Sequence, residues 1–321
     1  MNESDTYLEK FGYRSYKGPI DSRRRRIISL IRFEVVSTWS RSTFGKVLLI
    51  FLVGMNLITV MILASISEAM DYSDEQQRDI LNSFIAGYLQ FGDGTITAGT
   101  SDTFSFSMPL GIFIIALFAI AGSGMFADDK QGKVIEIYLS RLQKREYVLG
   151  KIGAIMVYIN LFLMIPLLIT GGLYVQSFGI SHLEMLDFYF GIIFFSLITS
   201  LLLGLLILSF SILVEKRAYA SLGVFLLYLI GTIIAQILME LDSGNEFLIL
   251  LSPEFFLILL AYICLGDFHL GRWTDWNIEP FLLDDGKGLE YYHVLLTTVI
   301  VIVVLSLFLS YKIRKMTTEE L

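Results

Sequence analysis

The sequence predicts an all-α, polytopic membrane protein with six transmembrane helices. Of the 321 residues, 55% are apolar, and the mean hydropathy is +0.68. The apolar residues gather in repeated runs of about 20 residues, which soluble domains do not contain. Lys and Arg are concentrated in alternate segments between these runs. Because cytosolic loops carry an excess of Lys and Arg, this sorting predicts both the number of spans and their orientation.

Residues 1–46 are predicted to form a cytosolic N-terminus that ends in an interfacial helix. No cleavable signal peptide is expected, because no short apolar core precedes a small-residue cleavage site. Between residues 23 and 43, apolar side chains share one helical face, which indicates a helix lying along the inner leaflet. These side chains are Ile28, Ile31, Val35 and Trp39. The alternative is a helix packed on the protein's own spans. Four Arg at 23–26 indicate contact with anionic membrane lipids, and no nucleic-acid partner is expected.

Six apolar runs are long enough to cross a bilayer, which takes about 20 residues. They lie at residues 47–69, 108–127, 147–175, 186–213, 219–240 and 291–311, within a transmembrane domain of residues 47–311. The segments 70–107 and 241–290 are assigned to the outer side, with a helix and then a loop expected in the first of them. The loops 128–151 and 216–217 and the tail 312–321 are assigned to the cytosol. This layout places 21 of the 24 Lys and Arg in the cytosol.

Residues 247–265 form a seventh apolar run, which Ser252 and Pro253 interrupt. Ser is a preferred N-cap and Pro is favoured at the first helical position, so a helix is predicted to begin there. The residues that follow are too few to cross the bilayer alone. A seventh span would also put the basic C-terminal tail outside. The prediction is a re-entrant helical hairpin on the outer side, buried in protein because unpaired backbone groups cannot face lipid.

The segment 128–151 is predicted to contain a short amphipathic helix on the cytosolic side. After Gly132, four apolar residues share one helical face: Ile135, Tyr138, Leu139 and Leu142. Glu136, Ser140 and Lys144 lie on the opposite face. A helix of this kind at the mouth of two spans suits the docking of a cytosolic partner. The alternative is a basic loop that only fixes the orientation of the chain.

The same segment resembles the loop between the second and third spans of type-2 ABC transporter permeases. The resemblance rests on Gly132, Glu136, Leu139-Ser140, Arg145 and Gly150-Lys151, followed by an apolar run. In that family the loop forms a coupling helix that inserts into a cleft of the ATP-binding subunit. An elbow helix precedes the first span, and two half-helices precede the last. The sequence departs from the family at Leu142, where Pro is frequent, so the helix is expected to continue there.

The resemblance implies a permease subunit that exports or handles a lipid-like or amphipathic substrate in the cell (plasma) membrane. Its partners would be an ATP-binding-cassette ATPase subunit and a second permease copy or a homologue. The implied main contact with the ATPase is Gly132, Glu136, Tyr138, Leu139, Ser140, Arg141 and Arg145. The implied smaller contact is Glu215, Lys216 and Arg217. The competing function is a membrane scaffold or assembly factor that docks a cytosolic partner without transporting anything.

No catalytic, cofactor or metal site is predicted on this chain. It contains no GxxxxGK[ST] motif, so ATP and Mg²⁺ are expected on the partner subunit. It also contains no HExxH motif and no Cys/His cluster. Gly122-Ser123-Gly124 is similar to the serine motif of an intramembrane protease, but every His is predicted at the outer side, away from Ser123. Close helix packing through small residues is the favoured role of this motif.

The predicted spans contain almost no ionisable side chains, which argues against a secondary transporter driven by protons or sodium. Their few central polar residues are Asn56, Thr59, Asn160, Thr199 and Ser200. Such residues most often form hydrogen bonds between helices. The alternative is that some of them line an uncharged substrate route.

Overall fold

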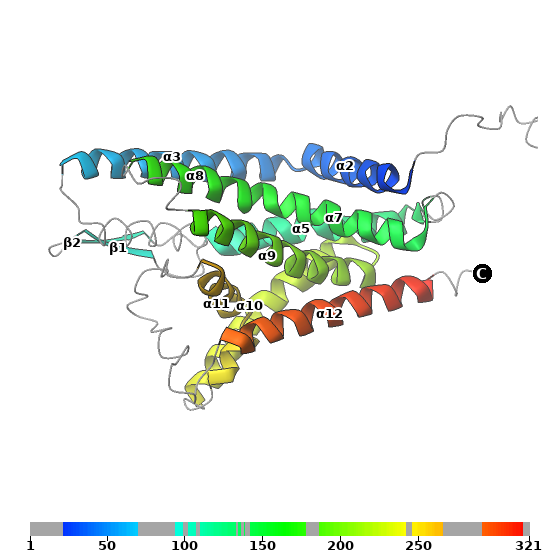
Figure 1. Ribbon diagram of the computed structural model, residues 1–321. Helices are drawn as coiled ribbons and strands as arrows, with labels where there is room; N and C mark the ends of the chain where they lie inside the picture. The colour runs from blue at the N-terminus through cyan, green and yellow to red at the C-terminus, as the bar shows by residue number, and fades with distance from the viewer. Residues whose placement is uncertain are drawn as a thin grey trace, which may run out of the picture.

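The computed structural model describes residues 22–69, 94–98, 102–106, 110–132, 134–135, 138, 142–177, 186–241, 246–265 and 291–316. This part of the chain is almost entirely helical, and most of its helices run side by side (Figure 1). The longer helices are α2 (Arg23–Arg41), α3 (Thr43–Ala69), α5 (Leu110–Gln131), α7 (Lys144–Phe162), α8 (Met164–Ser177), α9 (Leu186–Leu213), α10 (Arg217–Leu241), α11 (Pro253–Leu265) and α12 (Tyr291–Met316).

Among the described residues, four helical segments are long and apolar enough to cross a membrane. They are Lys144–Leu173, Leu186–Leu213, Arg217–Ala235 and Tyr292–Lys315. Large apolar side chains also stay exposed along the outer faces of α10 and α12, among them Ile230, Ile233, Val299 and Val303. A face of this kind is favourable in lipid and unfavourable in water. These helices indicate a membrane protein.

Helix α9 lies at the centre of the bundle and packs against α5, α7, α8, α10, α11 and α12. Glycines permit the closest approaches between α5, α7 and α9. A Cβ atom on Gly122 would lie 2.7 Å from Ile207 Cγ2, and one on Gly204 would lie 2.8 Å from Ile155 Cγ2. Ser123 is buried, and its Oγ donates to the carbonyl oxygen of Ile120 at 3.1 Å. This geometry agrees with the packing role predicted for Gly122-Ser123-Gly124.

Ser211 of α9 bonds directly to the backbone of α5. Its hydroxyl accepts hydrogen bonds from the N–H groups of Phe126 at 3.0 Å and Ala127 at 3.1 Å. It also donates to the carbonyl oxygen of Ser123 at 2.6 Å. One hydroxyl can donate once and accept twice, so its whole capacity is used.

Replacing Ser211 with Ala is therefore expected to lower the free energy of unfolding by about 1–3 kcal/mol, because buried backbone groups lose a partner. Urea unfolding in detergent micelles would measure the loss. Ser209→Ala is the matched control, since Ser209 is equally buried on α9 but its Oγ has no partner among the described residues. Equal effects of the two substitutions would contradict this role for Ser211.

The predicted all-α class holds for the described fold, and one local expectation is wrong: the end of the segment 70–107 contains two short paired strands. Strand β1 (Gly94–Ala98) pairs antiparallel with β2 (Asp102–Phe106), and Gly94 lies opposite Phe106. The sequence analysis expected a loop there. Alternation of Thr or Ser with Ile or Phe is the period-two pattern of a strand, and it favours this pairing over a helix.

The span predicted over residues 147–175 is two helices, α7 and α8, separated at Leu163. Pro166 explains the interruption, because proline has no N–H to donate to the carbonyl of Phe162, and its ring clashes with that carbonyl. The backbone N–H of Leu163 still donates to Ile159 O at 3.0 Å. The polypeptide therefore continues in the helical direction after a local break.

Two short helical elements precede α12. A 3₁₀ helix, η1 (Glu246–Leu251), is followed by Ser252 and by α11, which begins at Pro253 as the sequence predicts. Helix α11 packs against α9, α10 and α12, with Leu257, Leu259 and Leu260 buried. The expected burial of this segment in protein is therefore correct for α11.

The helix predicted between residues 23 and 43 is α2, and it packs mainly against α7. Ile31, Val35 and Trp39 of the predicted apolar face lie against the core, whereas Ile28 is 62% exposed. Leu30 is buried above Gly150, where an added Cβ would contact Leu30 Cδ2 and lie 3.0 Å from its Cγ. The alternative interpretation, a helix packed on the protein's own helices, is correct for this face.

Candidate functional site

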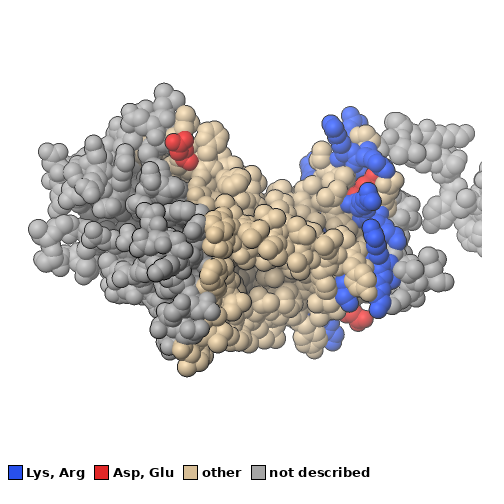
Figure 2. All heavy atoms as spheres, turned by 60° about the horizontal axis from the view of Figure 1, so that its bottom comes forward, with Lys and Arg blue, Asp and Glu red and all other residues tan. Residues whose placement is uncertain are grey.

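Lys and Arg side chains form a band at one end of the molecule, and the middle of the same face is uncharged (Figure 2). We call this the basic end. It contains the N-terminal ends of α2, α7 and α10 and the C-terminal end of α12, with Arg23–Arg26, Lys144, Arg145, Lys216, Arg217, Lys312, Arg314 and Lys315. The chain thus brings together the four basic segments that the sequence analysis assigned to one side of a membrane.

The connecting segment, residues 132–143, joins α5 to α7 at this end. The N–H of Tyr138 donates to Val134 O at 3.1 Å, and the N–H of Leu142 donates to Tyr138 O at 2.8 Å. These are the i→i−4 hydrogen bonds of an α-helix. Tyr138 and Leu142 pack against the core, as expected for the apolar face of the predicted amphipathic helix.

The predicted partner contacts divide into three groups. Gly132, Arg145, Glu215, Lys216 and Arg217 are exposed at the basic end, as a docking surface requires. Tyr138 is half-buried, and its ring faces the bundle. Glu136, Leu139, Ser140 and Arg141 lie outside the described residues.

A buried ionic cluster lies directly behind the connecting segment. Lys151 is fully buried, and its Nζ lies 2.7 Å from Glu34 Oε1 and 2.6 Å from Asp129 Oδ2. The Tyr147 hydroxyl donates to Asp129 Oδ2 at 2.6 Å. The same Nζ lies 5.4 Å from the ring centre of Tyr147 and 5.7 Å from that of Tyr138, within cation–π range. We call these five residues the Lys151 cluster; one ammonium group joins α2, α5, α7 and the connecting segment.

The Lys151 cluster holds two carboxylates around one cation. Burial, the largest effect, raises the pKa of Glu34 above its ordinary value of 4.5, although the ammonium of Lys151 acts in the opposite direction. Glu34 therefore binds a proton more readily than an exposed glutamate. Burial, together with the nearby Asp129 and Glu34 carboxylates, also raises the pKa of Tyr138 above its ordinary value of 10.0.

A second ionic contact fixes the N-terminus of α2 to the start of α7. Glu146 Oε1 lies 3.1 Å from Arg23 Nε and 3.3 Å from Arg26 Nη2. Its Oε2 accepts from the backbone N–H of Gln143 at 3.1 Å, which is half of a capping box. Arg23 and Arg26, predicted only as lipid contacts, thus also bind within the chain.

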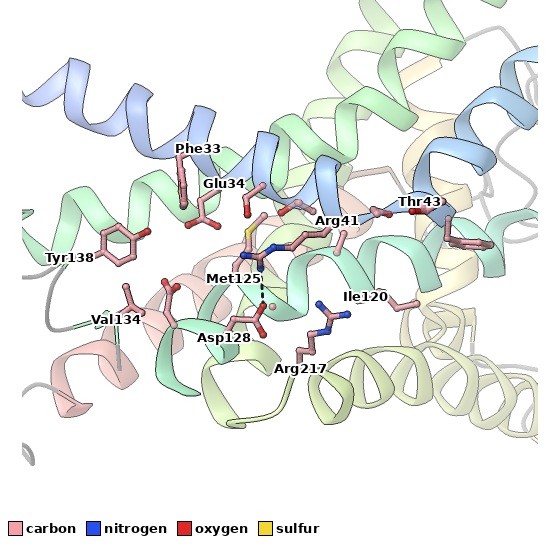
Figure 3. A pocket seen from close by; sticks show the side chains of 17 residues that line it. Phe33, Glu34, Arg41, Thr43, Ile120, Met125, Asp128, Val134, Tyr138 and Arg217 are labelled. Atoms are coloured by element: carbon pink, nitrogen blue, oxygen red, sulfur yellow. Dashed lines mark ion pairs between the residues drawn. The ribbon is translucent and has the colours of Figure 1, made fainter. Parts of the chain in front are cut away.

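A pocket of about 510 Å³ opens between the α2–α3 junction, α5, the connecting segment and the start of α10 (Figure 3). Its charged lining residues are Glu34, Arg41, Asp128, Asp129 and Arg217. Arg41 Nη1 lies 3.5 Å from Asp128 Oδ2. Arg217 reaches into the pocket from the side opposite α2 (Figure 3). The two predicted partner-contact regions therefore border one pocket, through Tyr138 and Arg217.

The structure brings together two of the predicted substrate-route residues, Asn160 and Ser200. Asn160 Nδ2 donates to Ser200 Oγ at 2.8 Å, which is a buried hydrogen bond between α7 and α9. This is the helix-joining role that such residues most often have. Thr199 is also buried on α9. The side chains of Asn56 and Thr59 lie outside the described residues, and the substrate route stays a prediction.

The sequence analysis missed Glu34, Asp129, Tyr147 and Lys151 as a unit. Lys151 follows the basic loop and was counted with it. One signal was available: Glu34 falls four residues after the buried Leu30, on the side of α2 that faces the bundle.

A comparison with models of known protein families and a comparison with curated proteins each find no match to this chain.

Proposed function

We propose that this chain is the permease subunit of an ABC transporter and that a separate ATP-binding subunit docks on the 128–151 loop. The observation that carries the proposal is the position of the connecting segment. Its described residues lie at the basic end, Tyr138 and Leu142 pack on the bundle, and the Lys151 cluster lies behind it. In this proposal the chain has six spans with both termini in the cytosol, in the plasma membrane, and η1 and α11 form the outer hairpin.

In the proposed mechanism, force passes from the ATP-binding subunit to the helical bundle of this chain. ATP binding closes the nucleotide subunits, and the connecting segment moves with them. The Lys151 cluster passes this movement to α2, α5 and α7, because packed elements joined by buried ion pairs move together. The bundle of two permease subunits then changes the side on which it is open. The substrate class that we favour is lipid-like or amphipathic, and the direction is export.

Reversing charge on the predicted docking helix tests this proposal. In the double variant Glu136→Lys, Arg141→Glu, the amount of ATP-binding subunit that copurifies is expected to fall about tenfold or more, since like charges would face each other across the contact. Stimulation of ATP hydrolysis should be lost with it. Arg24→Glu is the control, because Arg24 is exposed at the basic end but lies outside the proposed contact. Wild-type copurification and ATP hydrolysis by the double variant would refute the docking assignment.

Reconstituted vesicles separate transport from the competing scaffold function. ATP-dependent movement of a fluorescent phospholipid by the complex would support the permease. A stable complex that neither stimulates ATP hydrolysis nor moves substrate would instead support a non-transporting membrane scaffold or assembly factor.

A further inference from the structure

The pocket between α2, α5 and α10 combines charged lining residues with exposed apolar neighbours. It borders the junction of α2 and α3, at the point where the first long apolar helix begins. Large apolar side chains stand exposed at its edge, namely Phe33, Phe44 and Ile120. A charged pocket beside exposed apolar side chains fits an amphipathic molecule that keeps its chains in the bilayer.

Two guanidinium groups of the pocket are suited to phosphate. Arg217 lines the pocket and is not a member of the ion pairs found among the described residues. Arg41 is 66% exposed and lies 3.5 Å from Asp128, which is longer than an ordinary charged hydrogen bond. Each guanidinium has five N–H donors in a planar fork that matches phosphate oxygens.

The carboxylates of the pocket argue against a purely anionic ligand. Glu34, Asp128 and Asp129 all line it. Lys151 lies against Glu34 and Asp129 from behind, so these two acids already have a cation. Asp128 is 34% exposed, and it pairs only with the exposed Arg41 among the described residues, at 3.5 Å. With Lys151 included, the three acids Glu34, Asp128 and Asp129 are matched by three bases, Arg41, Arg217 and Lys151. This balance of charge suits a ligand that carries one positive and one negative group.

We infer that this pocket binds one zwitterionic phospholipid head group, with its phosphate between Arg41 and Arg217 and its ammonium group on Asp128. The pocket volume of about 510 Å³ lies in the range of small-molecule sites. That this head group belongs to a lipid of the cytosolic leaflet is a further step, and that step alone rests on the proposed function. Lipid binding by this chain needs no ATP-binding subunit. A chain that binds no lipid would refute this inference alone, and a chain that binds no ATP-binding subunit would refute the transporter proposal alone.

The test uses the purified full-length chain in detergent, with binding measured by calorimetry. The probes are dihexanoyl phosphatidylethanolamine, dihexanoyl phosphatidylglycerol and inorganic phosphate. The ethanolamine lipid is expected to bind about tenfold more tightly than the glycerol lipid, because only the former offers a cation to Asp128. Arg217→Gln is expected to weaken it about tenfold, whereas Lys216→Gln, adjacent but outside the pocket lining, should leave it unchanged.

If Arg217→Gln loses binding because it misfolds, Asp128→Asn still tests the inference. For this variant we expect a change in the preference between the two lipids. This variant should lose its preference for ethanolamine and bind the glycerol lipid at least as well. Equal binding of the two lipids by the wild-type chain would overturn the inference. Competition by millimolar inorganic phosphate, or wild-type binding by Arg217→Gln, would also overturn it.

Discussion

Replacing Lys151 with Met is expected to lower the free energy of unfolding by about 3–5 kcal/mol, the cost of leaving a buried ion pair without one partner. Lys151 is fully buried between Glu34 and Asp129. Met has a similar length but no charge, so the packing is largely kept while both carboxylates lose their cation. Thermal unfolding of the purified chain in detergent would measure the loss. Lys144→Met, an exposed lysine on the same helix, is the control.

A triple variant separates the loss of charge balance from the loss of packing. Glu34→Gln and Asp129→Asn remove the two carboxylates that Lys151→Met leaves unpaired. Because uncharged side chains of similar volume often replace a buried ion pair at little cost, the triple variant should recover most of the stability. A triple variant as unstable as Lys151→Met would show that the packing of the lysine, and not its charge, stabilises this end of the bundle.

Replacing Gly150 with Val is expected to destabilise the protein by about 1–3 kcal/mol through overpacking, and to separate α2 from α7. Any Cβ at this position would contact Leu30 Cδ2 and lie 3.0 Å from Leu30 Cγ. Leu30 is held above Gly150 by the ion pairs of Glu34 and Glu146 on either side. Limited proteolysis of α2, together with thermal unfolding, would report the separation.

Gly172→Val is the matched control, since a Cβ there meets only the Tyr189 hydroxyl, at 3.8 Å. Leu30→Ala should partly rescue Gly150→Val, because the smaller side chain leaves room for the added methyl groups. This non-additivity is the sign of a direct contact. Independent, additive effects of the two substitutions would show that Gly150 does not set the approach of α2.

Local features of the sequence predicted much of the helical structure. The start of α11 at Pro253 follows from the backbone of proline itself, which favours the first helical position. The hairpin of β1 and β2 and the break at Leu163 were missed although their signals are also local. The strands were missed because a loop was expected there, although Thr alternates with apolar residues. The break was missed because one long helix was expected across 147–175, although Pro166 lies within it.

The basic end was predicted as a set of loops, but its internal contacts were not. Lys151 stands at the edge of an apolar run, as Lys46 does, and nothing in the neighbouring residues distinguishes them. Lys46 is half-exposed and bonds to a carbonyl of its own segment, whereas Lys151 is fully buried between two acids. Burial depends on which helices cover a residue, and this information is not contained in a local window.

The sequence by itself determined the membrane character of the chain and the gathering of cations at one end, because hydropathy and charge along a segment act locally. Only the tertiary structure decided that Glu34 and Lys151, 117 positions apart, form an ion pair and that Arg41 and Arg217 border one pocket. The physical reason is that the energy of a buried charge depends on the distance to its partner and on the water removed around it. Both quantities are fixed only when α2, α5, α7 and α10 pack together.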